Sequence, residues 1–541
     1  MTSVASSVEL PSGVDDHSPK PKLDHPLDLR AILFFLAIVA LGLAFTAWSI
    51  YKDILESGAP VTNFLPFILL GVALLIALGF EFVNGFHDTA NAVATVIYTH
   101  SMPAPIAVVW SGFFNFLGVL FSTGAVAFGV VSLLPVELIL QVGSQAGFAM
   151  VFALLIAAIV WNLGTWWLGL PASSSHTLIG SIIGVGIANA LMRGRDGTSG
   201  VDWGKATEIG YALLASPVVG FVSAALLLLA LKFLVRKPEL YAEPKGQAAP
   251  PWWIRSLLVL TCTGVSFAHG SNDGQKGMGL IMLILIGTVP TSYALNRALP
   301  ASHLESFSKA SHAASKLVEA KASGYNVLGD PRPAVTTYVA QHQINEGTYP
   351  SLAVLINDIA QQIESYGSIA KIPFATVGNT RNDIYLASEA LRFLAKDDAA
   401  ALSDPDKKTL AAYKTQIDSA TKFIPIWVKI AVALALGLGT MIGWKRIVVT
   451  VGEKIGKQHL TYGQGAAAEV VAMVTIGAAD SFGLPVSTTH VLSSGVAGTM
   501  AANGSGVQMA TIRNMLMAWV LTLPCAILIS GSLYFLFSKV L

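Results

Sequence analysis

Apolar stretches long enough to cross a lipid bilayer recur along the whole of this chain. A helix needs about 20 apolar residues to span the hydrocarbon core. Seven stretches reach about that length: 31–50, 64–83, 104–133, 147–170, 207–235, 424–443 and 511–537. Six shorter apolar segments lie between them: 88–99, 178–192, 253–268, 277–289, 466–480 and 491–503. The pattern predicts an all-α polytopic membrane protein with about 10–12 transmembrane segments, some of them broken helices.

The composition agrees with a membrane protein and excludes several other classes. Apolar residues make up 53% of the chain and charged residues only 12%, about half the charged fraction of a soluble domain. A net charge of +1 gives no electrostatic basis for binding nucleic acid. Cys262 and Cys525 lie far apart in apolar segments, which provides neither a disulfide framework nor metal-ligand spacing. We therefore expect a protein surrounded by lipid, with no nucleic-acid partner and no bound cofactor.

Four segments differ in composition and predict the domain organisation. Residues 1–30 form a polar tail, and the absence of a cleavable signal pattern makes the first span an uncleaved anchor. Residues 31–289 and 421–541 are the membrane part. Residues 290–420 hold 25 of the 65 charged residues, which predicts a soluble helical insert. One face of its predicted helix at 351–367 carries Leu352, Leu355, Ile356, Ile359 and Ile363.

Basic residues cluster at the membrane edges of two loops, 232–255 and 445–457. Short cytoplasmic loops carry an excess of lysine and arginine, so both loops are predicted to be cytoplasmic. The rule is weaker for long loops, and the membrane side of the insert stays open at this point.

Two pairs of segments show that the membrane part is duplicated. "FVNGFHDTANAVATVIY" (82–98) parallels "FAHGSNDGQKGMGLIML" (267–283), and "GLPASSSHTLIGSIIG" (169–184) parallels "GLPVSTTHVLSSGVAG" (483–498). In the first copy the aspartate of the motif precedes the hydroxyl-rich loop by 85 residues, and in the second copy by 214 residues. The 131-residue insert in the second copy accounts for this difference to within two residues. Gly85 and Gly270 are the predicted helix breaks. Broken apolar segments at matching places in two halves indicate a transporter site, and an inverted arrangement would bring both copies together near the membrane midplane.

The two hydroxyl-rich loops have the chemistry of an oxyanion site. Each places serine or threonine directly before an apolar helix, where free backbone N–H groups and the helix dipole attract anions. Two such helix ends facing each other would cradle a tetrahedral oxyanion. Taken singly, either loop could instead be an ordinary helix cap, but the duplication favours the anion site. The candidate residues are Ser173, Ser174, Ser175, Ser487, Thr488 and Thr489.

Acidic side chains near the predicted helix breaks indicate a cation or proton path, because charges inside a membrane are costly and mark function. Asp88 and Asp273 are the main candidates, and helix caps at the water interface are the alternative. Glu469 and Asp480 are further acids within apolar segments. Lys276 could either pair with Asp273 or occupy the space of a transported sodium ion. The neighbouring candidates are Glu81, His87, Asn91 and Asn272.

The four long motifs, with "WNLGTWWLGLP" (161–171) and "ALALGLGTMIGWKRI" (433–447), resemble those of the inorganic phosphate transporter (PiT) family, most closely its bacterial low-affinity permeases. The resemblance implies two inverted repeats with re-entrant hairpins, usually in a homodimer, in the cytoplasmic membrane of a bacterium. It implies import of inorganic phosphate by cation symport, as a neutral complex with a divalent metal in many bacterial members. The six hydroxyl residues would contact phosphate, while Asp88, Asn91, Asn272 and Asp273 would bind the coupling cation or proton.

The motifs depart from those of sodium-coupled members in two places. Those members carry Asn-Asp-x-x-Asn in this motif. Here the first copy has His87 before Asp88, and the second copy has Lys276 where the last asparagine would stand. The departure favours protons over sodium as the coupling ion.

Three other functions compete with phosphate symport. A sulfate permease of the same family would bind an anion of the same shape. An intramembrane serine hydrolase could use the serine, histidine and aspartate residues, but the Gly-x-Ser-x-Gly elbow is missing and a duplicated hydroxyl loop has no use in it. A passive anion channel is disfavoured, because buried acids would repel the permeating anion.

Overall fold

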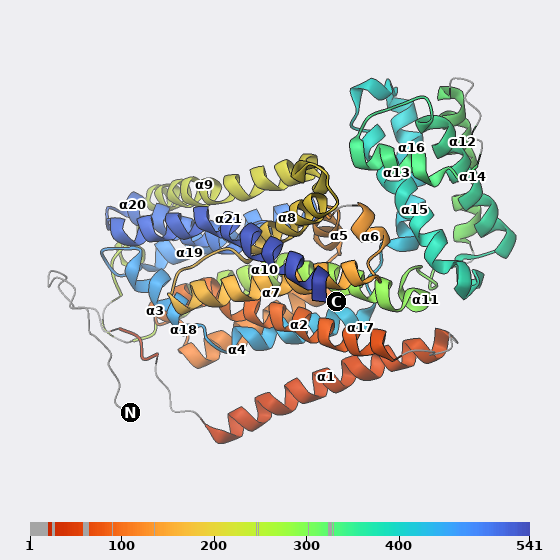
Figure 1. Ribbon diagram of the computed structural model, residues 1–541. Coiled ribbons are helices and arrows are strands. Elements are labelled where there is room, and N and C mark those ends of the chain that lie inside the picture. Colours follow the sequence, from red (N-terminus) through yellow and green to blue (C-terminus); the bar gives the residue numbers. More distant parts are fainter. Residues whose placement is uncertain are drawn as a thin grey trace.

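The computed structural model describes residues 20–23, 28–57, 64–88, 90–134, 136–244, 246, 248–300, 302–322, 327 and 329–540, with the backbone alone for 90 and 91. Their regular secondary structure is helical throughout, apart from one isolated bridge between Gly456 and Val507. The all-α prediction is therefore confirmed. Figure 1 shows an elongated helical body with a smaller group of helices, α12–α16, standing out from one end.

The helices up to the insert follow the predicted apolar segments. They are α1 (Leu29–Ser57), α2 (Leu65–Asp88), α3 (Ala90–Tyr98), α4 (Ala104–Phe121), α5 (Ala125–Val131), α6 (Val136–Leu140), α7 (Gln145–Trp167), α8 (Ser174–Met192), η1 (Gly197–Gly200), α9 (Trp203–Leu234), η2 (Pro238–Leu240), α10 (Trp252–Thr288) and α11 (Pro290–Tyr293). Those after the insert are α17 (Ile426–Thr440), α18 (Lys445–Val449), η5 (Thr450–Lys454), α19 (Tyr462–Ser481), α20 (Thr488–Asn503) and α21 (Met509–Val540).

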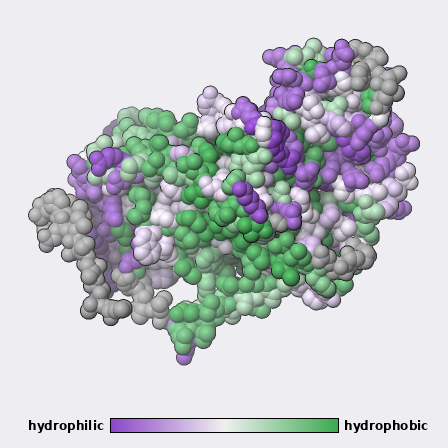
Figure 2. All heavy atoms as spheres, viewed as in Figure 1, coloured by the Kyte–Doolittle hydropathy of each residue, from purple (hydrophilic) through white to green (hydrophobic). Residues whose placement is uncertain are grey.

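Seven of the described helices are long and apolar enough to cross a membrane, and the bent pair α16–α17 allows an eighth. The prediction of 10–12 segments is higher than this count. The helices α10 and α19 explain part of the difference, since both are long enough to cross but carry charged side chains in mid-helix, including Asp273, Lys276 and Glu469. Apolar side chains dominate the visible surface of the helical body in Figure 2.

The predicted helix breaks at Gly85 and Gly270 are wrong. Residues 253–268 and 277–289, expected as separate pieces, form one continuous helix, α10, that runs through Gly270. Gly85 lies inside α2, three residues before its last residue. Both glycines are instead close-packing positions, because an added Cβ would lie 2.2 Å from the Leu436 carbonyl oxygen at Gly85 and 2.2 Å from the Asn115 carbonyl oxygen at Gly270.

The duplicated segments form equivalent helices that exchange neighbours. The aspartate motifs end α2 and lie within α10, and the hydroxyl loops open α8 and α20. The helix α8 packs against α21, while its counterpart α20 packs against α9. Figure 1 shows α9 beginning at the insert end of the body and α21 beginning at the opposite end. The exchange and the opposite starting ends of α9 and α21 agree with an inverted repeat, and inversion of the two complete halves stays a prediction.

The insert has a hydrophobic core of its own. Its helices are α12 (His303–Lys321), α13 (Arg332–Gln341), α14 (Thr348–Tyr366), η3 (Ile369–Lys371), α15 (Phe374–Leu394), η4 (Asp398–Ala400) and α16 (Asp404–Thr421). The predicted apolar face of α14 is buried at all five positions. Hydrophilic residues cover most of the outer surface of this group in Figure 2. The domain boundaries at 290 and 420 stay a prediction.

Candidate functional site

The hydroxyl loops bring the N-termini of α8 and α20 to one place inside the membrane body. Ser173 caps α8, where its Oγ accepts a hydrogen bond from the His176 backbone N–H at 3.2 Å. Ser487 caps α20 in the same way, accepting from His490 N–H at 3.1 Å. The rings of His176 and His490 lie 4.7 Å apart between their centroids. The two helix dipoles therefore direct their positive ends toward a shared region.

Asp88 lies between these two helix ends. Ser174 Oγ donates a hydrogen bond to Asp88 Oδ2 at 2.5 Å, and Thr489 Oγ1 donates to Asp88 Oδ1 at 2.8 Å. His87 Nδ1 is 2.8 Å from Asp88 Oδ1, and its other ring nitrogen is 3.1 Å from Thr165 Oγ1. One buried carboxylate thus contacts a hydroxyl from each of the two repeats.

The second aspartate is paired with lysine in the same region. Lys276 Nζ lies 2.8 Å from Asp273 Oδ1, one turn apart on α10, and donates to Ser175 Oγ at 2.6 Å. Both side chains are fully buried. Ser174 Oγ is also 3.3 Å from Asp273 Oδ2, so one serine contacts both aspartates. Lys276 therefore forms the ion pair with Asp273, which was one of the two alternatives that the sequence left open for it.

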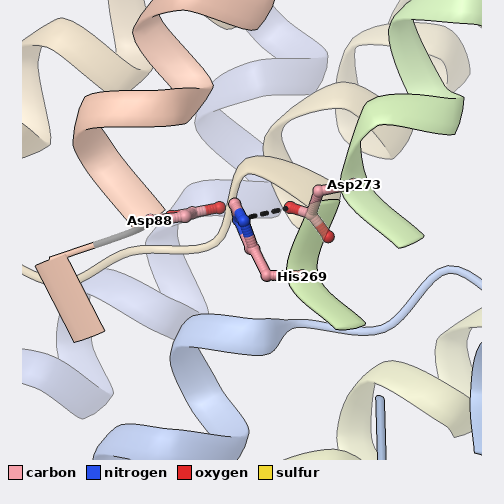
Figure 3. Close-up of side chains that lie close together, drawn as sticks. All are labelled: Asp88, His269 and Asp273. Atoms are coloured by element: carbon pink, nitrogen blue, oxygen red, sulfur yellow. Dashed lines mark ion pairs between the residues drawn. The ribbon is translucent and has the colours of Figure 1, made fainter. Parts of the chain in front are cut away.

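His269 joins the two aspartates in Figure 3, where its imidazole lies between Asp88 and Asp273. The possible ligand atoms of the three residues all lie within 4.8 Å of one another. His269 Nε2 is 3.6 Å from Asp273 Oδ2, and Nδ1 is 2.8 Å from Asn115 Oδ1. This histidine was not among the predicted site residues. The available signal was its position four residues before Asp273, which places both side chains on one helix face.

The remaining candidates are distributed around this centre. Asn272 Nδ2 donates to the Leu484 carbonyl oxygen at 3.1 Å, in the loop before α20. Glu81 is buried on α2, its carboxylate lies against the backbone of Gly277, and Asn84 Nδ2 is 3.4 Å from Glu81 Oε2. Thr488 Oγ1 is buried without a hydrogen-bond partner among the described residues. The side chain of Asn91 lies outside the described residues.

The charges restrict what this centre can hold. Asp88, Asp273 and Glu81 contribute three acidic groups, while Lys276 is the single lysine or arginine placed among them within the described part of the chain. The hydroxyls of Ser174 and Thr489 already donate to Asp88. An incoming anion can take those hydrogen bonds only when a proton or a metal cation neutralises Asp88, because two anions sharing the site would repel each other.

Comparison with known proteins decides the family. The family model described as "Phosphate transporter family" matches residues 84–530, which is most of the chain. The chain belongs to the phosphate transporter family. The motif-based resemblance is thereby confirmed, and since the family consists of transporters, the serine hydrolase alternative is wrong.

Individual relatives agree with this assignment. The low-affinity inorganic phosphate transporter PitA of Escherichia coli K12 is 44% identical over 494 residues, covering 87% of this chain and 96% of PitA. PitB of the same organism is 42% identical over 505 residues. A solved structure titled "The sodium-dependent phosphate transporter" matches 88% of this chain and all of its own, with a TM-score of 0.49 and 19% identity. The prediction of a multi-pass protein in a bacterial cytoplasmic membrane agrees with the spans and with these relatives.

Proposed function

We propose that this protein is a low-affinity importer that couples inorganic phosphate to protons by secondary active symport. The observation that carries the proposal is the position of Asp88 between the N-termini of α8 and α20, with a hydroxyl donor from each. When Asp88 is neutralised, the hydroxyl groups of Ser174 and Thr489 would donate their hydrogen bonds to phosphate instead of to the carboxylate. The other loop residues, Ser173, Ser175, Ser487 and Thr488, would complete the cradle.

The arrangement favours symport over a passive channel. With its acids ionised, the centre repels phosphate, so a cation or proton must accompany each anion. Binding of one then strengthens binding of the other, which favours the doubly loaded state over the half-loaded states that would uncouple transport. An ungated pore for anions would gain nothing from three buried carboxyl groups.

Protons fit the surroundings of Asp88 better than sodium does. Sodium, like other hard cations, is held by oxygen ligands, whereas Asp88 has the imidazole groups of His87 and His269 beside it. Imidazole binds and releases protons near neutral pH. The ammonium group of Lys276 also supplies a fixed positive charge between Asp273 and Ser175, at a position where a sodium ion would otherwise bind.

Phosphate carried as a neutral complex with a divalent metal also agrees with this charge pattern. Two carboxylates and an imidazole are a common ligand set for first-row divalent metals. The metal in this case is cargo, and Asp88, His269 and Asp273 are the groups that it would meet. The assembly that we expect is a homodimer, as the family resemblance implies.

Uptake into liposomes tests the function. The purified protein is reconstituted, and labelled phosphate uptake is followed under an imposed pH gradient, an imposed sodium gradient, or neither. We expect accumulation with an inward proton gradient and no additional response to sodium. Uptake indifferent to both gradients would contradict symport, sodium-driven uptake would favour the sodium-coupled alternative, and abolition by excess sulfate would favour a sulfate permease.

A further inference from the structure

A cavity of about 340 Å³ lies between the insert and the membrane body. Its membrane-side wall comes from α5 and α10, and its insert-side wall comes mainly from α15. Five basic side chains line it, together with a single acid, Glu389. The basic residues are Lys205, Arg381, Arg392, Lys396 and Lys422. A cavity with this lining attracts anions.

Most of these cations have carboxylate partners. Arg392 Nη2 lies 2.6 Å from Glu389 Oε2 and 2.8 Å from Asp202 Oδ2. Glu208 is 2.7 Å from Lys205 Nζ and 3.4 Å from Lys396 Nζ. Asp418 lies 3.0 Å from Lys422 Nζ. Lys414, outside the lining, also pairs with Asp418, so six cations face these four carboxylates and the cluster stays positive.

Among the five lining cations, Arg381 alone has no carboxylate partner in the described part of the chain. Its side chain is 7% exposed, yet within the described residues its guanidinium contacts no carboxylate. Nη1 donates to the neutral oxygens of Ile139 (3.4 Å) and Asn382 (3.2 Å), and the group lies 5.1 Å from the centre of the Tyr385 ring. Burial lowers the pKa of Arg381. Buried charges are normally paired, and a planar guanidinium fits a phosphate oxyanion through two hydrogen bonds.

The cavity adjoins the transport centre on the side of the insert. Gly279 lines it and lies one turn beyond Lys276 on α10. Gly129 also lines it, and an added Cβ there would meet the carbonyl oxygen of Gly483, in the loop that leads to α20, at 3.1 Å. The end of the cavity at Gly279 is therefore about one helical turn from Lys276, roughly 5 Å along the helix axis, and the lining extends from there along α10 to Ile286.

The positions of the loops place this cavity on the outer side of the membrane. The loop at 232–255 joins the far end of α9 to the start of α10, and the loop at 445–457 lies at that same end, while the insert is attached to the opposite end of α10 (Figure 1). The strongly basic loops are predicted to be cytoplasmic, so the insert faces outward.

We propose that this cavity is an outward-facing capture site for inorganic phosphate, built jointly by the insert and the membrane body, with Arg381 as its principal anion ligand. The inference rests on the proposed function and assigns a role to the insert. The site concentrates phosphate beside the cradle, and it therefore sets the apparent affinity for phosphate rather than the maximal rate.

Three charge-neutralising variants test this role in proteoliposomes made of zwitterionic lipid. We expect Arg381→Gln to raise KM for phosphate about three- to tenfold, with a maximal rate that stays close to wild type. Lys396→Gln, which removes an exposed charge, should raise KM about twofold at low ionic strength and have no effect at high ionic strength. The matched control, Lys408→Gln, removes an exposed insert charge away from the cavity and should leave KM unchanged.

Several results would overturn the proposal. The first is an unchanged KM in both cavity variants, and the second is an equal rise of KM in the Lys408→Gln control. The third is a lower maximal rate and a lower Tm of Arg381→Gln at unchanged KM, which would mean that Arg381 has a structural role. A KM effect that appears only when anionic lipid is added would identify a lipid headgroup as the ligand and would also contradict capture of free phosphate.

A binding measurement separates this proposal from the proposed function. If the wild-type protein transports no phosphate, the transport function fails, and the cavity is judged by the rise in Tm that millimolar phosphate produces. Loss of that rise in Arg381→Gln, with retention in Lys408→Gln, would support the capture site. Persistence of the full rise in Arg381→Gln would exclude it.

Discussion

At the scale of single residues, the pairing of Lys276 with Asp273 sets the charge of the transport centre. The ammonium group bridges an aspartate of one motif and a serine of the other repeat's hairpin. We propose that this ammonium group acts as a permanent cation at the position that, by the family resemblance, holds asparagine in sodium-coupled members. We therefore propose that Asp88 is the aspartate whose charge changes during transport.

Replacing that lysine tests this interpretation. Lys276→Asn leaves the buried Asp273 carboxylate without its partner, which should destabilise the protein by about 3–5 kcal/mol. A sodium ion could restore the missing charge, so we expect the Tm of this variant to rise in sodium chloride relative to potassium chloride. The wild-type protein and the control Lys408→Asn should show the same Tm in both salts. A sodium-insensitive Tm for Lys276→Asn would show that the lysine does not occupy a cation site.

Many residues of this centre could be predicted from the sequence, but most of their contacts with one another could not. The convergence of the Asp88 motif with both hydroxyl loops follows from the duplication, and Ser174 and Thr489 do meet Asp88. Their roles in transport stay predictions. For His269 the sequence held one signal, its spacing of four residues from Asp273, whereas its contacts with Asp88 and Asn115 depend on the fold. Arg381 could not be found in this way, because the walls of the insert cavity come from segments distant in the chain.

At the scale of helices, small residues decide how closely the elements approach. Gly85 and Gly270 were predicted to break helices, since glycine weakens a helix in isolation. The structure uses them where the backbones of α17 and α4 come close to α2 and α10. The two uses of glycine look the same in a single sequence, and only the position of the partner helix distinguishes them.

Alanine substitutions separate the two explanations. At Gly85 or Gly270 an added methyl group overlaps a carbonyl oxygen, and we expect each variant to lose about 1–3 kcal/mol of stability. Gly79, on the same helix α2, has no atom within 4 Å of an added Cβ. Gly79→Ala should therefore leave the Tm unchanged or raise it slightly. A raised Tm for Gly85→Ala would mean that the position is not closely packed. Thermal unfolding in detergent measures all three variants.

At the scale of the whole molecule, the two ends differ in charge and in construction. The basic loops gather at one end of the membrane body, and the insert with its own core stands at the other (Figure 1). The positive-inside rule orients the first end toward the cytoplasm. We therefore predict that the insert, whose membrane side the sequence left open, lies on the outer side of the membrane.

Labelling of introduced cysteines tests this orientation. Lys408 on the insert and Lys237 in the basic loop are both exposed, so a cysteine at either position can react. In spheroplasts, a membrane-impermeant maleimide should label Lys408→Cys and should label Lys237→Cys only after the membrane is permeabilised. The opposite pattern would place the insert in the cytoplasm and would contradict an outward-facing capture site.

The central claim is that Asp88 carries the coupling proton between the two hairpin helices, and Asp88→Asn tests it most directly. The amide keeps the shape of the side chain but cannot be ionised, so coupling should be lost while the phosphate cradle survives. In proteoliposomes, we predict that this variant exchanges internal for external phosphate at a measurable rate and no longer accumulates phosphate under an imposed pH gradient. Full gradient-driven accumulation by Asp88→Asn would contradict the account.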